Sequence, residues 1–119
     1  MSKEEIPPWL REQLARFDQL QQSLQAILIQ KQQVEMEIAE IERAVGELKK
    51  ASPEETVFKL AGSILIKVKR DDMLKELEEK REIANTRSLV LAKQETRMRE
   101  NVKSLQAKID ETLRPKPPS

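Results

Sequence analysis

The chain has 119 residues, enough for one small domain, and 36% of them are charged while only 3% are aromatic. Its 22 basic and 21 acidic residues leave a net charge of +1, which gives no indication of a polyanion partner held by bulk charge. Cysteine and histidine are absent, which excludes disulfides, thiolate chemistry and the commonest general base. This composition is typical of long helices and favours a mechanical or adhesive role over catalysis.

The sequence offers no export or membrane-spanning segment. Residues 1–8 lack an apolar core of signal-peptide length. The longest apolar runs are four residues, such as Ala26–Ile29 and Leu89–Ala92, and they are too short to cross a bilayer. We therefore expect a cytoplasmic protein with no membrane partner and no cofactor.

A strict heptad of apolar residues runs through the first half of the chain. Ten of its twelve seam positions are apolar, where about five would be expected from the overall content of 38%. The pattern predicts a coiled-coil helix over residues 8–51, which Ser52 and Pro53 stop because the residue before proline avoids helical geometry. The seam positions are 10, 13, 17, 20, 24, 27, 31, 34, 38, 41, 45 and 48.

Residues 56–69 are the only stretch with strand chemistry, and they predict a β-hairpin. Gly62 suits the left-handed position of a three-residue connection. Folding about Gly62 pairs Leu60 with Ile64, and Phe58 with Ile66. This register predicts one nearly all-apolar face, made of Phe58, Leu60, Ile64, Ile66 and Val68.

An isolated hairpin of this kind is marginal in water, and its open edges invite strand pairing with other chains. We therefore expect the hairpin to be an oligomerisation site. The alternative is that it folds onto the adjoining helix ends of its own chain. The candidate oligomerisation residues are Val57, Phe58, Leu60, Gly62, Ile64, Leu65, Ile66 and Val68.

A second heptad predicts a helix over residues 71–114, with eight of eleven seam positions apolar. The two helices have nearly equal length, so the fold class is predominantly α-helical, an antiparallel two-helix coiled coil joined by one hairpin. Residues 115–119, rich in proline, are expected to be a disordered tail. Two polar seam residues, Lys31 and Glu95, would lie about a turn apart, where they either pair or reach past the thin seam to water.

The helix ends farthest from the hairpin carry more apolar surface than a coil end needs for solubility. Trp9 is the only tryptophan, and Phe17 is one of two phenylalanines. Exposed apolar surface at a chain end often marks a binding site. The alternative is that Leu10 and Phe17 simply close the seam. The candidate tip residues are Trp9, Leu10, Leu14, Phe17, Leu105, Ile109 and Leu113.

Helix, apolar hairpin, helix in a chain of this length resembles the beta subunits of archaeal prefoldins, over residues 8–114. The heptads alone are weak evidence. The more specific part is residues 57–68, with a lysine-leucine pair, a glycine and an aliphatic strand, followed by Arg70-Asp71-Asp72. The single hairpin is similar to the beta type, since alpha subunits have two.

The resemblance implies a single prefoldin-like domain over residues 1–119 and an ATP-independent holdase chaperone. In this family two alpha and four beta subunits join their hairpins into a double β-barrel, and the coiled-coil tips hold unfolded polypeptides and pass them to a group II chaperonin. Carried over to this chain, Val57–Val68 would be the assembly site, and the candidate tip residues would contact clients.

Other functions are less favoured. Catalysis lacks a Gly-rich phosphate loop and a cysteine or histidine nucleophile or base, so we do not expect an enzyme. Nucleic-acid binding would depend on the short basic run Lys67–Arg70, which acidic residues follow at once. The serious alternative is a structural coiled-coil scaffold that oligomerises without binding clients. It explains the heptads equally well, but it leaves Trp9 at the tip unexplained.

Overall fold

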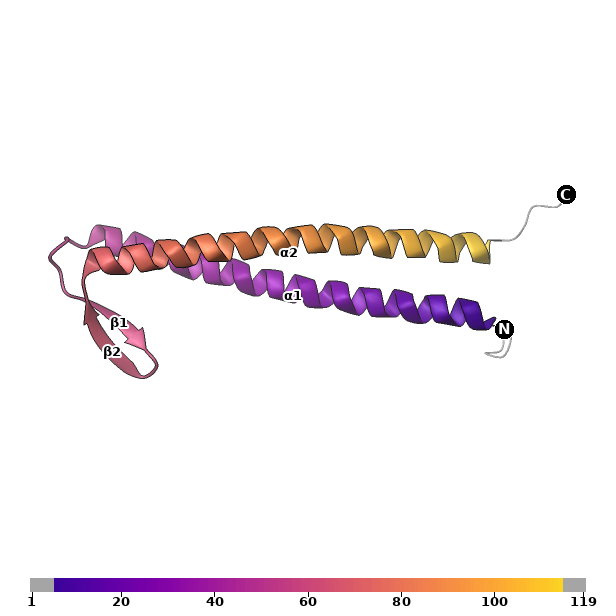
Figure 1. Ribbon diagram of the computed structural model, residues 1–119, viewed down its shortest axis with the longest axis horizontal. Helices are drawn as coiled ribbons and strands as arrows, with labels where there is room; N and C mark the ends of the chain where they lie inside the picture. The colour runs from indigo at the N-terminus through magenta and orange to yellow at the C-terminus, as the bar shows by residue number, and fades with distance from the viewer. Residues whose placement is uncertain (1–5, 115–119) are drawn as a thin grey trace. The chain divides into compact units, whose positions relative to one another are not determined.

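A computed structural model describes residues 6–114 as two long helices joined by a two-stranded antiparallel hairpin (Figure 1). Helix α1 runs over Pro8–Lys50, strand β1 over Val57–Ala61, strand β2 over Ile64–Val68, and helix α2 over Arg70–Leu113. The predicted fold class is confirmed in its helices and hairpin. The expected disordered tail, residues 115–119, lies outside the described residues.

The described chain divides into two compact units. The hairpin unit, Lys31–Val90, holds the hairpin with the end of α1 and the start of α2. The terminal unit holds the start of α1, up to Gln30, and the end of α2, from Leu91.

Proline sets both ends of α1. Pro8 is the first helical residue, where its missing N–H costs nothing and its fixed φ suits the helix. The carbonyl of Pro7 accepts hydrogen bonds from the amides of Leu10 and Arg11, at 3.0 and 3.1 Å. The helix ends at Lys50, shortly before Pro53.

The heptad seam is where the helices bury their apolar side chains. All twelve predicted seam positions of α1 are buried or half-buried, as are the eleven of α2. In the hairpin unit Ile41, Val45 and Leu77 form the buried cluster, and Leu48 and Leu74 pack against it. The hydrophobic interior is therefore a single line of side chains, as a two-helix coil requires.

The hairpin register differs from the sequence expectation. Leu60 pairs with Leu65, and Ala61 pairs with Ile64, so the connection is the two residues Gly62-Ser63 and not three. Gly62 has φ of +62°, and no other described residue has a positive φ, which are the signs of a type II′ turn. The predicted pairing of Leu60 with Ile64 and of Phe58 with Ile66 was wrong by one residue.

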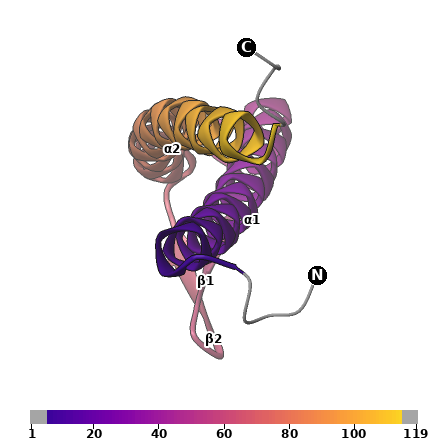
Figure 2. The same ribbon diagram turned by 90° about the vertical axis from the view of Figure 1, so that its right-hand side faces the viewer.

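A shift of one residue changes which side chains share a face. The pairs Phe58–Lys67 and Leu60–Leu65 lie on one face of the hairpin, which we call the outer face. The other, inner face carries the pairs Val57–Val68, Lys59–Ile66 and Ala61–Ile64. The predicted single apolar face is therefore wrong, because apolar side chains occupy both faces. In Figures 1 and 2 the turn of this ribbon points away from α2.

Candidate functional site

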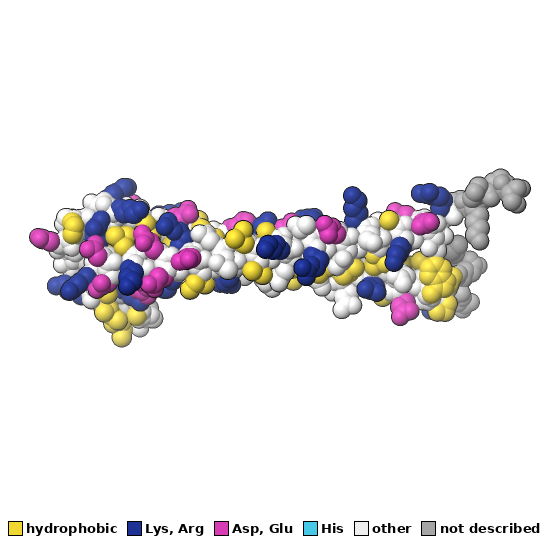
Figure 3. Space-filling view, turned by 45° about the horizontal axis from the view of Figure 1, so that its top comes forward, with side chains coloured by type: hydrophobic (Ala, Val, Ile, Leu, Met, Phe, Trp, Pro, Cys, Tyr) yellow, Lys and Arg dark blue, Asp and Glu magenta, His cyan; other side chains and the backbone are white. Residues whose placement is uncertain are grey.

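The hairpin carries large apolar side chains that the rest of residues 6–114 leaves exposed. Figure 3 shows them as a patch on the projecting ribbon. Their exposed fractions are 67% for Leu60, 66% for Leu65, 64% for Ile64, 56% for Phe58 and 47% for Ile66. The alternative in which the hairpin folds onto its own helix ends does not describe this structure, because these five side chains would then be buried.

One ion pair ties the hairpin to the start of α2. The Nζ of Lys59 on β1 donates a hydrogen bond of 2.5 Å to Oε1 of Glu76, and the Nζ of Lys80 lies 3.7 Å from the same oxygen. The Lys59 and Glu76 side chains are both half-buried. The hydrogen bond from Lys59 is the main reason that the pKa of the Glu76 carboxyl falls below its ordinary value of 4.5.

A second polar contact ties the two helix ends of this unit together. The Nε of Arg70, the first residue of α2, donates a 2.8 Å hydrogen bond to the carbonyl of Leu48 near the end of α1. The Arg70 side chain is only 16% exposed, and its Nη1 also lies 3.2 Å from Asp71 Oδ1. The same Leu48 carbonyl, in the last turn of α1, also accepts a 3.2 Å hydrogen bond from the amide of Ala51, so Arg70 is its second partner.

The terminal unit carries the second apolar surface. Leu10, Leu105 and Ile109 form a buried cluster, against which Phe17 and Leu20 pack half-buried. Outside this cluster, Trp9 is 49% exposed, Leu14 40% and Leu113 61%. Figure 3 shows apolar side chains gathered at this end of the helices.

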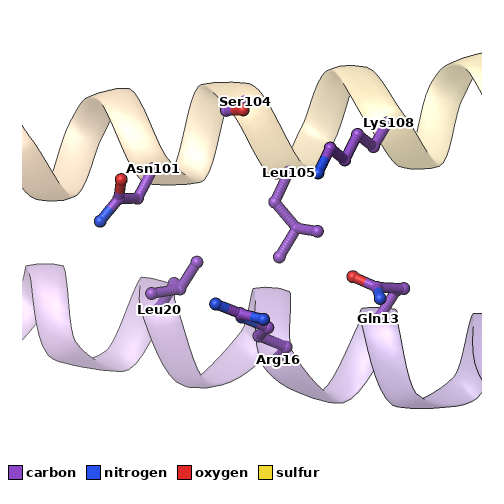
Figure 4. Close-up of a pocket in the computed structure, with 7 residues that line it drawn as sticks. All are labelled: Gln13, Arg16, Leu20, Asn101, Ser104, Leu105 and Lys108. Carbon is purple, nitrogen blue, oxygen red and sulfur yellow. The ribbon is translucent and has the colours of Figure 1, made fainter.

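Two shallow hollows open beside the buried cluster of the terminal unit. One has a volume of about 220 Å³ and includes Trp9, Gln13 and Ile109 in its lining. The other, of about 250 Å³, has Leu20 of α1 and Leu105 of α2 pointing into the space between the helices, with polar side chains around them (Figure 4). Its lining residues are Gln13, Arg16, Leu20, Asn101, Ser104, Leu105 and Lys108. Extended apolar groups could lie in such open hollows, but neither forms a closed pocket for a small molecule.

The structure separates the seven predicted tip residues into two groups. Four of them pack in the seam, as the alternative interpretation proposed for Leu10 and Phe17. These four are Leu10, Phe17, Leu105 and Ile109. Only Trp9, Leu14 and Leu113 keep large exposed apolar surface. Sequence reasoning missed Ile6, which packs against the tip cluster from just before α1. Its signal was an apolar residue four positions before Leu10, a spacing that continues the heptad.

No group of three or more carboxylate, histidine or cysteine residues within residues 6–114 is placed to hold a metal ion. Over the same residues, neither helix combines the length and the apolar character that spanning a bilayer requires.

Glu95, one of the polar seam residues, accepts a 2.8 Å hydrogen bond from Nε of Arg99, and its pairing with Lys31 stays a prediction.

Comparison with known proteins settles the family. The family model described as prefoldin subunit matches residues 11–115. The chain belongs to the prefoldin family. Two archaeal prefoldin beta subunits are among the proteins that are similar to this chain in sequence. That of Pyrobaculum arsenaticum is 38% identical over 109 residues, covering 92% of this chain and 88% of the relative. That of Archaeoglobus fulgidus is 40% identical over 111 residues, covering 93% and 96%.

Solved prefoldin structures have the same fold. The crystal structure of the prefoldin beta subunit from Thermococcus strain KS-1 matches with a TM-score of 0.86 and 34% identity, covering 94% of this chain and 98% of that one. The beta2 subunit from the same strain matches with a TM-score of 0.69 at 23% identity, over 76% and 97%, which supports the fold alone. The resemblance to beta-type prefoldins, inferred from the hairpin sequence, is confirmed.

Proposed function

We propose that this chain is the beta subunit of an ATP-independent holdase, which holds unfolded polypeptides and passes them to a group II chaperonin. Membership of the prefoldin family supports chaperone-type function. The observation that carries the finer proposal is that large apolar side chains are exposed on the hairpin and on the helix ends of the terminal unit, although the seam positions are buried or half-buried. Other exposed apolar side chains, such as Ile29 and Ile83, lie along the helices between these two sites. A scaffold that only oligomerises would need the apolar surface of the hairpin but not that of the helix ends.

The hairpin is the proposed assembly site. An unaccompanied two-stranded ribbon with apolar side chains on both faces is poorly stable in water. Burial of one such side chain contributes roughly 1.5–3 kcal/mol, so five of them offer ample free energy for association before entropy is counted. We propose a hexamer with two alpha subunits and four copies of this chain, in which the hairpin residues Val57–Val68 form a β-barrel.

The helix ends of the terminal unit are the proposed client-binding site. Trp9, Leu14 and Leu113 offer apolar surface beside shallow hollows, so a client would bind by burying its own apolar groups without sequence readout. Each contact is small, and several tips acting on one chain would supply avidity. Release then needs no nucleotide hydrolysis, because breaking one weak contact at a time is fast. We place this activity in the cytoplasm, without a nucleic-acid or membrane partner.

The test is suppression of aggregation by the assembled hexamer. A chemically unfolded protein is diluted into buffer with this chain and an alpha-type prefoldin subunit, and light scattering is followed. The combined variant Trp9→Ser, Leu14→Ser and Leu113→Ser should lose at least half of the protection while its hydrodynamic mass is unchanged. The matched control carries Ile83→Ser and Leu89→Ser, which are similarly exposed at 62% and 65% but lie in the hairpin unit. Equal protection by the tip variant and the control would contradict the proposal.

Trp9 gives a direct second measurement. It is the only tryptophan and the chain has no tyrosine, so its emission reports on one site. Adding an unfolded client that lacks tryptophan should shift the emission of the assembled protein to shorter wavelength. A reporter version, Trp9→Phe with Leu89→Trp, should show no shift. If the hexamer forms but neither scattering nor Trp9 emission responds to clients, the scaffold alternative is correct.

A further inference from the structure

We propose that Lys59 and Glu76 act as positioning residues that hold the hairpin at one angle to α2, with its outer face turned toward the partner subunits. The inference rests on the proposed function, since it concerns how the hairpin is presented for assembly. It adds to that function a defined orientation and the two residues that set it.

The geometry of the contact supports this role. Lys59 lies in the middle of β1, and Glu76 lies in the second turn of α2, 17 residues further along the chain. Their hydrogen bond of 2.5 Å is between charged groups, which makes it shorter and stronger than a neutral one. Each side chain is 34% exposed, so solvent screens the pair only in part.

Apolar side chains of the hairpin are covered only at the ends of the strands away from the turn, where Val57 and Val68 are half-buried. The buried cluster of the hairpin unit is formed by Ile41, Val45 and Leu77, with four flanking side chains, and no hairpin residue belongs to it. The hairpin is joined to the helices by the turn-rich residues 51–56 on one side and by Lys69 on the other. Without a specific side-chain contact, rotation about these links would change the direction in which the ribbon points.

The contact also determines which face is presented. Lys59 belongs to the inner face, and because its Nζ reaches Glu76 this face is turned to α2. Val57 and Val68, which pair on the same face, are half-buried. Phe58, Leu60 and Leu65, on the outer face, therefore point away from the helix, and their exposed fractions are 56%, 67% and 66%. On the inner face Ile64 and Ile66 also stay exposed, at 64% and 47%.

A fixed angle lowers the cost of assembly. A ribbon that samples many directions loses that freedom when it joins a partner, whereas a ribbon already held in the binding orientation does not. The pair therefore contributes to association without touching the partner, and we expect its loss to weaken assembly and leave the helices intact.

Charge reversal with exchange tests the pair. Lys59→Glu and Glu76→Lys, made singly, should each raise the concentration needed for half-assembly with an alpha-type subunit about three- to tenfold, the range expected for losing a partly exposed ion pair and adding repulsion. The double variant keeps one acid and two bases among positions 59, 76 and 80, so it should recover to within about twofold of the original. Sedimentation velocity measures the assembly, and circular dichroism measures helix content.

The control is Glu79→Lys, which makes the same charge change one turn further along α2 at an exposed residue. It should assemble like the original chain. Single variants that assemble normally, or a double variant as weak as the singles, would overturn the inference. If the original chain itself fails to assemble with an alpha-type subunit, the proposed function fails instead, so the two failures are distinguishable.

Distance measurement reads the orientation directly. The chain has no cysteine, so spin labels can be attached to cysteines introduced at Ser63 in the turn and at Lys75 on α2. We expect one narrow distance distribution in the original background, a broad one with Glu76→Lys, and a narrow one again in the double variant. A distribution that is equally narrow in all three would overturn the inference, even if assembly changed.

Discussion

Val34 is 1% exposed and is the largest side chain that is fully buried within residues 6–114. Val34→Ala removes two methyl groups from a seam that is one side chain thick. We expect it to lower the free energy of unfolding by about 2 kcal/mol, from the lost burial and the cavity left behind. Denaturant unfolding followed by circular dichroism at fixed protein concentration measures the change. Met36→Ala, two residues along and 59% exposed, is the control and should change stability by less than about 0.5 kcal/mol.

Glu76 predicts a pH dependence at the same scale. The carboxyl faces Lys59 from β1 and Lys80 from its own helix, and the hydrogen bond from Lys59 chiefly lowers its pKa from 4.5. A carboxyl with a lowered pKa stabilises the folded state above its ordinary pKa, and this contribution is lost as the pH falls through the lowered value. The stability difference between the original chain and Glu76→Gln should therefore be present at pH 7 and decrease as the pH falls from the ordinary pKa of 4.5 through the lowered pKa of Glu76. A difference that stays constant down to pH 3 would contradict this prediction, and carboxyl NMR titration would show whether the pKa is lowered.

The residue scale also shows where sequence reasoning stops. The burial of seam residues follows from the heptad alone, because a period of seven fixes the face of each helix. The contact between Lys59 and Glu76 does not, because it depends on the angle between a ribbon and a helix that no local pattern encodes. The heptad does separate Leu10, which is a seam position, from Trp9, Leu14 and Leu113, which are not, and the exposed fractions follow that division.

At the scale of the element, the hairpin is where the sequence misled. The two strands and a turn at Gly62 were predicted correctly, but the connection has two residues where three were expected, and the register was wrong by one residue. Ile64, Leu65 and Ile66 are consecutive apolar residues, so alternation cannot tell which of them faces inward. The better signal was the dipeptide Gly62-Ser63, because glycine followed by serine between two apolar runs is typical of a two-residue type II′ connection.

The two glycines provide a matched prediction for their elements. A Cβ added at Gly46 or Gly62 would meet nothing within 4 Å, so an alanine at either position would not clash with neighbouring residues. Gly46 lies within α1, where Gly46→Ala should stabilise the helix by about 0.5–1 kcal/mol. Gly62 has φ of +62°, which an L side chain adopts only with strain, so Gly62→Ala should destabilise the hairpin by about 1–2 kcal/mol.

Thermal unfolding measures the effect at Gly46, and assembly with an alpha-type subunit measures the effect at Gly62. Gly62→Asn is the control for conformation, because asparagine tolerates positive φ better than alanine does. A Gly62→Ala variant that assembles as well as the original chain would show that the turn is remodelled on assembly.

At the scale of the whole molecule, the chain is a subunit that places two apolar surfaces in separate units. The resemblance to the prefoldin family depended mainly on the hairpin sequence between two helices, and comparison confirmed the family. Neither the sequence nor a single chain contains the contacts between subunits, so the barrel, the stoichiometry and the chaperonin partner remain proposals.

Avidity gives a prediction at this scale. If several tips hold one client, diluting hexamers with subunits that carry Trp9→Ser, Leu14→Ser and Leu113→Ser should reduce protection more steeply than in proportion to the fraction of altered chains. Light scattering across a series of mixing ratios measures the curve, and native mass spectrometry confirms that mixed hexamers form. A straight line would indicate that each tip acts alone.

The exposed hairpin residues from Phe58 to Ile66 make the unassembled chain prone to aggregation. Before the chain assembles with other subunits, its hairpin exposes apolar side chains and unpaired strand edges, as misfolded proteins also do. We expect surplus copies to be aggregated or degraded, so that balanced synthesis of the two kinds of subunit sets how much of the finished particle accumulates.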